Sequence, residues 1–96
     1  MILAVDVGNT NIVIGCIEDG TIVFDGRLKT DVSKTDMEFA VMLKNILTIN
    51  NIDIGSLEGA IISSVVPPIN QALKTAVRLA VGKEPIMVTG CEGLKV

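Results

Sequence analysis

The sequence predicts an α/β fold built around a five-stranded mixed sheet, and three observations lead to this prediction. Short runs rich in Ile and Val are separated by turn residues in the first part of the chain, which indicates strands joined by tight turns. Two later segments carry apolar residues at helical spacing. A further apolar run follows each helical segment, so the order is β-β-β-α-β-α-β and the first, fourth and fifth strands are expected to be parallel.

The first three strands are predicted to form an antiparallel meander. Residues 2–7 are an apolar run that ends at Gly8, which is typical of a strand buried on both faces. Residues 10–18 form the second strand, and Asp19-Gly20 favours a two-residue hairpin because both turn positions adopt positive φ. Residues 21–28 form the third. One face of this strand is expected to carry Ile22, Phe24 and Gly26, and the other Val23, Asp25 and Arg27.

The first helix is predicted from its capping residues. Residues 30–34 are polar and form a loop, after which Thr35 and Glu38 have the spacing of a capping box. The helix should run to about Asn50 or Asn51, and residues 52–55 form a connection.

The remaining elements are a strand, a helix and a last strand. Residues 59–65 form a short apolar strand, which Pro67-Pro68 ends before the next helix begins. Gly82 is suited to end that helix, residues 86–89 form the fifth strand, and a loop starts at Gly90. We expect a ribonuclease-H-like (actin-like ATPase) domain with sheet order 3-2-1-4-5 and helices on its faces.

Composition excludes several classes of function. The chain has 96 residues, enough for one small domain, and 49% of them are hydrophobic. There is no His, and the two cysteines, Cys16 and Cys91, form no CxxC pair, so neither a zinc site nor Cys–His catalysis is expected. Cys16 should pack as a small hydrophobic side chain. A net charge of −3 with only two aromatic residues is unfavourable for binding nucleic acid.

The sequence also bears on the cellular compartment. No segment has the eighteen or so consecutive apolar residues that a membrane-spanning helix needs. The first residues lead directly into Asp6 without the basic and apolar regions of a signal peptide. We therefore expect a cytoplasmic protein without a membrane partner.

The most informative feature is the polar turn after the first strand. Gly8 lets the backbone approach a ligand closely, while Asn9, Thr10 and Asn11 offer side-chain donors beside a run of backbone N–H groups. Such a concavity suits phosphate oxygens. Asp6 would then lie beside the β- and γ-phosphates of a nucleotide and hold Mg²⁺ through water. The alternative is an ordinary polar turn, in which Asp and Asn side chains bind their own backbone.

These residues give the chain a resemblance to a known family. It resembles the N-terminal part of type III pantothenate kinases, which belong to the superfamily of actin, hexokinase and heat-shock-chaperone ATPases. The resemblance rests on residues 6–11, 12–15 and 62–67 and extends over the whole chain. It implies that Asp6 has the Mg²⁺-linked role. It also implies that the phosphates of ATP are bound by Asp6, Val7, Gly8, Asn9, Thr10, Asn11, Ile12 and Val13.

The resemblance further implies a reaction and its requirements. The parent enzyme would transfer the γ-phosphoryl group of ATP to pantothenate, in the first step of coenzyme A synthesis, as a homodimer that uses Mg²⁺ and a monovalent cation, K⁺ or NH₄⁺. The family's later G-x-D-R motif, its second domain and its monovalent-cation ligand are missing from these 96 residues. We therefore assign no catalytic residue and expect a truncated N-terminal domain, inactive alone.

Two alternatives and one pair of serines stay open at this point. The chain could belong to a non-catalytic accessory protein of the same fold with a role in transcription, or to a kinase of the superfamily that acts on another acceptor. Ser63 and Ser64 resemble the family's serine pair before the proline. A structural role is the favoured interpretation of these two hydroxyls, which can satisfy backbone groups or cap the next helix.

Overall fold

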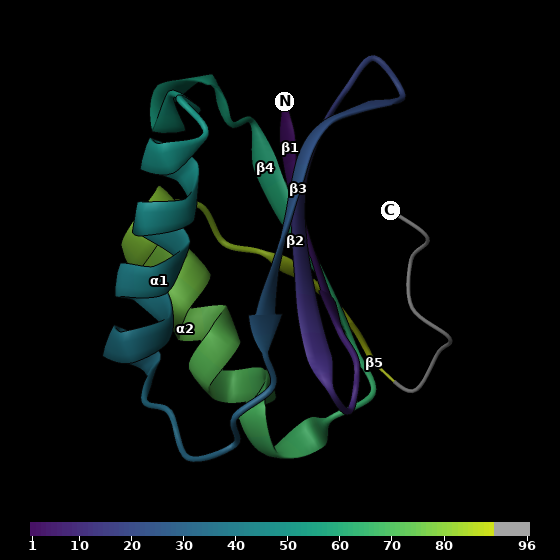
Figure 1. Ribbon diagram of the computed structural model, residues 1–96, viewed down its shortest axis with the longest axis vertical. Helices are drawn as coiled ribbons and strands as arrows, with labels where there is room; N and C mark the ends of the chain where they lie inside the picture. The colour runs from purple at the N-terminus through teal and green to yellow at the C-terminus, as the bar shows by residue number, and fades with distance from the viewer. Residues whose placement is uncertain (90–96) are drawn as a thin grey trace.

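A five-stranded sheet forms the centre of the molecule in the computed structural model, which describes residues 1–89 (Figure 1). The order of the strands across the sheet is β3-β2-β1-β4-β5, which confirms the predicted order. The predicted loop from Gly90, with Cys91, lies outside the described residues. The strands are β1 (Ile2–Val7), β2 (Asn11–Glu18), β3 (Thr21–Lys29), β4 (Gly59–Ser64) and β5 (Ile86–Thr89).

Strand β1 lies in the middle of the sheet and determines how its edges are arranged. It pairs antiparallel with β2 and parallel with β4, and β4 pairs parallel with β5. The carboxyl ends of these three parallel strands therefore meet at one edge, the lower edge in Figure 1. The turn between β1 and β2 lies at the same edge, as does the end of β3.

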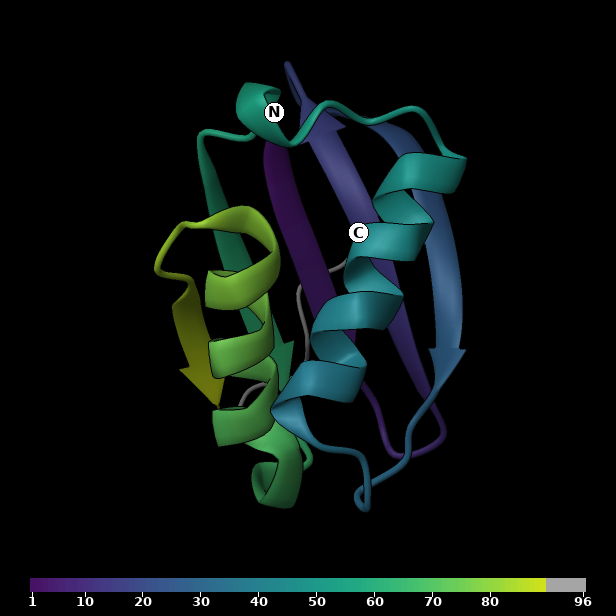
Figure 2. The same ribbon diagram turned by 90° about the vertical axis from the view of Figure 1, so that its left-hand side faces the viewer.

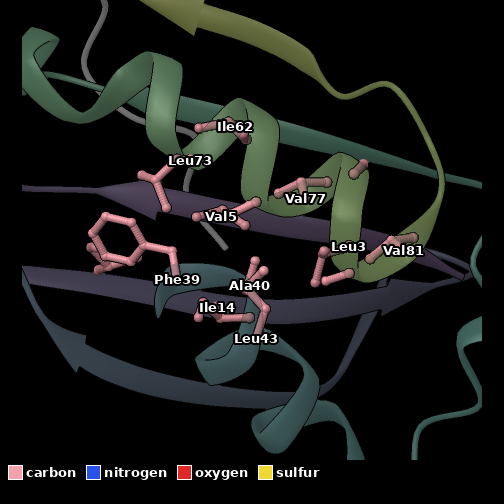
Figure 3. Packing of buried hydrophobic residues seen from close by; sticks show 14 of the residues in the cluster. Leu3, Val5, Ile14, Phe39, Ala40, Leu43, Ile62, Leu73, Val77 and Val81 are labelled. Carbon is pink, nitrogen blue, oxygen red and sulfur yellow. The ribbon is translucent and has the colours of Figure 1, made fainter. Parts of the chain in front are cut away.

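The two α-helices cover one face of the sheet. Helices α1 (Asp36–Ile49) and α2 (Asn70–Val81) pack against each other and lie on the same side of the strands (Figures 1 and 2). Leu3, Val5 and Val7 of β1 point toward them and belong to the hydrophobic core. Figure 3 shows the side chains of Leu3 and Val5 gathered with Ile14, Ile62 and residues of both helices. The core is aliphatic apart from Phe39 and Cys16.

Local sequence explains where each helix begins and ends. The Thr35 hydroxyl accepts the Glu38 N–H at 3.2 Å and the Glu38 carboxylate accepts the Thr35 N–H at 2.9 Å, which confirms the capping box. A short 3-10 helix, Ile54–Ser56, lies in the connection to β4. The prolines begin a 3-10 turn, Pro67–Ile69, so α2 starts only after it. Gly82 ends α2 with a φ of 77°, a conformation that glycine adopts without strain.

Strand β3 departs from the simple alternation predicted for it. Cys16 lies opposite Phe24, whereas Ile17 lies opposite Ile22, so Val23 is an extra residue in a β-bulge. Paired residues share a face, and Ile22 is therefore on the face opposite to Phe24 instead of beside it. The turn itself is as predicted, with positive φ at Asp19 and Gly20.

Two further findings concern the environment of Cys16 and the length and apolar character of the helices. The Cys16 side chain is fully buried in the core, and burial raises the pKa of its thiol to about 11, so it packs as a neutral hydrophobic group. Within residues 1–89, no helix combines the length and apolar character needed to cross a bilayer.

The capping box yields a prediction about stability. Replacing Thr35 by Ala removes the hydroxyl that accepts the Glu38 N–H, and the free energy of unfolding should fall by about 1 kcal/mol. Urea denaturation of both proteins, followed by circular dichroism, measures this difference. Thr48→Ala is the matched control, because Thr48 is exposed in the same helix and alanine favours helix there. An equal loss of stability in both variants would contradict the capping role.

Candidate functional site

The polar turn connects β1 to β2 at the carboxyl edge of the parallel strands. Asp6 and Val7 end β1, residues 8–10 form the turn, and β2 starts at Asn11. The Gly8 N–H donates a hydrogen bond of 2.9 Å to the Asn11 carbonyl. A Cβ atom at Gly8 would lie 3.3 Å from that same carbonyl oxygen, which is closer than ordinary contact, so this position favours glycine.

The end of β3 fixes the backbone of this turn. Thr30 donates twice: its N–H to the Thr10 carbonyl at 2.9 Å and its hydroxyl to the Gly8 carbonyl at 2.8 Å. Thr30 lies in the loop predicted for residues 30–34, but its contact with the turn was not predicted. One signal was available, because strand order 3-2-1 brings the end of the third strand to the first turn, where a hydroxyl can reach a free carbonyl.

The turn presents its donors to solvent. Asn9 and Thr10 are both exposed, and no hydrogen bond within residues 1–89 uses their N–H groups or their side chains. Peptide donors that are exposed, unpaired and close together are suited to bind an anion. This geometry favours the phosphate-binding interpretation over a turn whose Asn side chains bind their own backbone.

Asp6 lies next to the turn on the face of the sheet away from the helices. Its neighbours in sequence, Val5 and Val7, point into the core, so the alternation of the strand directs Asp6 to the other face. Across the sheet it lies between Val13 of β2 and Ser63 of β4. The carboxylate is partly buried and makes no ion pair or hydrogen bond with the described residues. It is therefore available to a cation.

The apolar residues of the predicted set divide into two kinds. The side chains of Val7 and Ile12 are buried in the core, so only their backbone could approach a ligand. Val13 is partly buried beside Asp6 and contributes apolar surface next to the carboxylate. The groups available for polar contacts with a ligand thus belong to Asp6 and to residues 8–11.

The two serines lie at the carboxyl end of β4, near the same edge. Both are buried, and the Ser64 hydroxyl accepts the Val66 N–H at 3.0 Å, across the bend that leads to the prolines. Ser64 thus satisfies a backbone group at the strand-to-helix junction, but it does not cap the next helix, because the N-terminus of α2 has no side-chain cap. Ser63 pairs in register with Asp6.

The side chains that could bind a metal ion determine what kind of metal site is possible. Among residues 1–89, no group of three or more His, Cys, Asp or Glu side chains gathers to hold a metal ion. Mg²⁺ in nucleotide sites is commonly bound by one or two carboxylates together with phosphate oxygens and water. The carboxylate of Asp6 is suited to bind a Mg²⁺ ion that arrives with a nucleotide, because the exposed peptide N–H groups of the turn beside it are suited to bind the phosphates.

A pocket lies apart from this turn. It has a volume of about 300 Å³ and is lined by Lys34, Met37, Glu38, Val41 and Met42, at the start of α1. None of these residues belongs to the turn between β1 and β2, so this pocket is not the candidate phosphate site.

Comparison with known proteins gives the family and, separately, the fold. The model of the family "type III pantothenate kinase" matches residues 2–95. A type III pantothenate kinase of Syntrophotalea carbinolica is 40% identical over 88 residues, which are 92% of this chain and 34% of that protein. The chain thus spans about a third of the length of that relative.

Two solved structures share the fold at low sequence identity. The ROK hexokinase of Thermus thermophilus superposes with a TM-score of 0.65 at 13% identity, over 92% of this chain and 33% of the hexokinase. The RuvC protein of Thermus thermophilus superposes with a TM-score of 0.55 at 13% identity, over 92% of this chain and 60% of RuvC. These likenesses place the domain among ribonuclease-H-like and actin-like ATPase folds. The family match, which extends over residues 2–95, shows that the chain belongs to the type III pantothenate kinase family and corresponds to its N-terminal portion.

Proposed function

We propose that this chain is the ATP-phosphate-binding part of a kinase that transfers the γ-phosphoryl group of ATP to pantothenate. The observation that carries the proposal is the turn of residues 8–11, which presents unpaired peptide donors to solvent beside the free carboxylate of Asp6. The family match supports pantothenate as the acceptor and coenzyme A synthesis as the pathway. The turn lies at the carboxyl edge of the parallel strands, where open α/β sheets commonly bind their ligands, and this position supports a nucleotide site there.

Each polar group of the site has a proposed part. The peptide N–H groups of residues 9–11 bind phosphate oxygens, and the Asn9 and Thr10 side chains add donors. Gly8 leaves room for the close approach of the phosphates. Asp6 is the residue that would hold Mg²⁺ beside the phosphates of ATP. When bound, this ion neutralises charge on the phosphates during transfer.

The remaining requirements of the reaction lie outside the described residues in this proposal. The base that activates the pantothenate hydroxyl, the pantothenate pocket and the ligand of a monovalent cation, K⁺ or NH₄⁺, would be contributed by the other two thirds of the family's length. No catalytic residue is assigned within this chain. A cytoplasmic homodimer, without nucleic acid or membrane partners, is the proposed setting of the intact enzyme.

The role of Asp6 is tested in the intact kinase that carries this segment. Asp6→Asn keeps the size of the side chain but removes the charge that would hold Mg²⁺, so kcat should fall by about 100-fold or more. The decrease should be partly relieved as Mg²⁺ is raised, because the weakened ion site then fills. Steady-state kinetics with ATP, pantothenate and a range of Mg²⁺ concentrations measure both effects.

Asp25→Asn is the matched control for this experiment. Asp25 lies on β3 and shares the face of the sheet on which Asp6 lies, but it is exposed on an edge strand away from the turn. This variant should have kinetics close to those of the wild type. A near-wild-type kcat for Asp6→Asn, or an equal loss in both variants, would exclude Asp6 from the Mg²⁺ site.

The 96-residue chain alone should not turn over its substrates. It offers one end of a nucleotide site without a base or a pantothenate pocket, so positioning of the two reactants is lost. A coupled assay of ADP release with ATP, Mg²⁺ and pantothenate measures this directly. Pantothenate-dependent ADP release by the purified chain would contradict the proposal that the base and the pantothenate pocket lie outside this chain.

A further inference from the structure

We propose that Thr30 is a positioning residue for the phosphate site, because it sets the direction in which the turn of residues 8–11 presents its peptide N–H groups. Thr30 lies directly after β3 and is partly buried. It contacts no ligand in this proposal and acts through the turn. The inference rests on the proposed function, since it assumes that the turn binds the phosphates of ATP.

Thr30 binds two carbonyl groups of the turn at once. The Thr30 hydroxyl donates to the Gly8 carbonyl at 2.8 Å, and the Thr30 N–H donates to the Thr10 carbonyl at 2.9 Å. Both bonds have good hydrogen-bond lengths. The bond to Gly8 joins residues that lie 22 apart in sequence, and the bond to Thr10 joins residues 20 apart, so both are tertiary contacts and not part of a local loop.

The planarity of the peptide bond couples each of these carbonyls to an N–H group. The Gly8 carbonyl and the Asn9 N–H belong to one rigid unit, and so do the Thr10 carbonyl and the Asn11 N–H. The described chain contains no cis peptide, so each N–H points opposite to its carbonyl. Because both carbonyls face Thr30, the N–H groups of Asn9 and Asn11 face away from it. Thr30 thereby orients two donors on the side where a phosphate would bind.

The described part of the chain gives the turn no other interaction that would do the same. The hydrogen bond that closes the hairpin runs from the Gly8 N–H to the Asn11 carbonyl, which leaves the Gly8 carbonyl to the hydroxyl of Thr30. Without that hydroxyl, the peptide between Gly8 and Asn9 has no partner within residues 1–89 to fix its rotation. Glycine at position 8 makes this rotation easier still.

The surroundings keep Thr30 itself in place. On one side it continues β3, and on the other side the Asp31 carboxylate accepts both the N–H and the hydroxyl of Ser33, at 2.9 and 2.6 Å. The capping box of α1 follows at Thr35. The β-branched side chain of threonine also restricts its own χ1 rotation. The hydroxyl is therefore held by a fixed backbone on both sides.

The test is nuclear magnetic resonance of the 96-residue chain, titrated with Mg·ATP and, separately, with Mg²⁺ and inorganic tripolyphosphate. Thr30→Val removes the hydroxyl but keeps the shape, and it should raise the Kd for both ligands about three- to tenfold, as expected for one lost hydrogen bond. The Asn9 amide resonance should move even without ligand, because its peptide is released. Thr30→Ser keeps the hydroxyl and should restore both properties.

Two further variants separate positioning from stability. Thr21→Val makes the same change at the other end of β3, where Thr21 is exposed, and it should bind like the wild type. Thr30→Ala gives the same test as Thr30→Val should the latter not fold. Urea denaturation of every variant shows whether a loss of affinity follows a loss of stability.

The outcomes distinguish this inference from the function on which it rests. Should Thr30→Val and Thr30→Ala bind as the wild type does, while Asp6→Asn weakens binding of Mg·ATP, the inference is wrong and the phosphate site stands. Failure of Thr30→Ser to restore binding would also overturn it. Should neither ligand move any resonance of residues 8–11 in the wild type, the proposed function and this inference are both contradicted.

Discussion

The pairing of β1 on both of its sides is the constraint on which the rest of the structure depends. Antiparallel pairing with β2 requires a turn directly after β1, and parallel pairing with β4 brings the end of β4 to the same edge. Asp6 is thereby placed beside the turn and between two neighbouring strands. Because the side chains of Leu3, Val5 and Val7 lie in the core, the register of β1 is fixed, and Asp6 is kept on the opposite face.

The order of the strands also explains how the backbone of the turn of residues 8–11 is held in one conformation. The order β3-β2-β1 carries Thr30 to the turn, although it lies 22 residues from Gly8 in sequence. Both helices pack on one face of the sheet and bury the core residues of β1 (Figure 2). The packed strands therefore support the residues at the carboxyl edge. A phosphate site supported in this way costs little reorganisation when a nucleotide binds.

Much of this arrangement follows from the sequence, and the exceptions have physical causes. Strand order and the capping box at Thr35 were predictable, because hydrophobic period and capping residues are local signals. The bulge that places Ile22 on the face opposite to Phe24 was not predictable, because it arises from the pairing between β2 and β3. The residues of the turn were predictable as candidates from Gly8 and its polar neighbours. The tether from Thr30 was missed, and the burial of Val7 and Ile12 was not specified, since both depend on tertiary packing.

The central claim is that the turn between β1 and β2 binds the phosphates of ATP beside Asp6. A crystal structure of the intact kinase with Mg²⁺ and a non-hydrolysable ATP analogue tests it most directly. We expect the β- and γ-phosphates within hydrogen-bond distance of the peptide N–H groups of residues 9–11, with Mg²⁺ joined to the Asp6 carboxylate directly or through one water. A triphosphate bound elsewhere, with this turn and Asp6 in contact only with solvent, would contradict it.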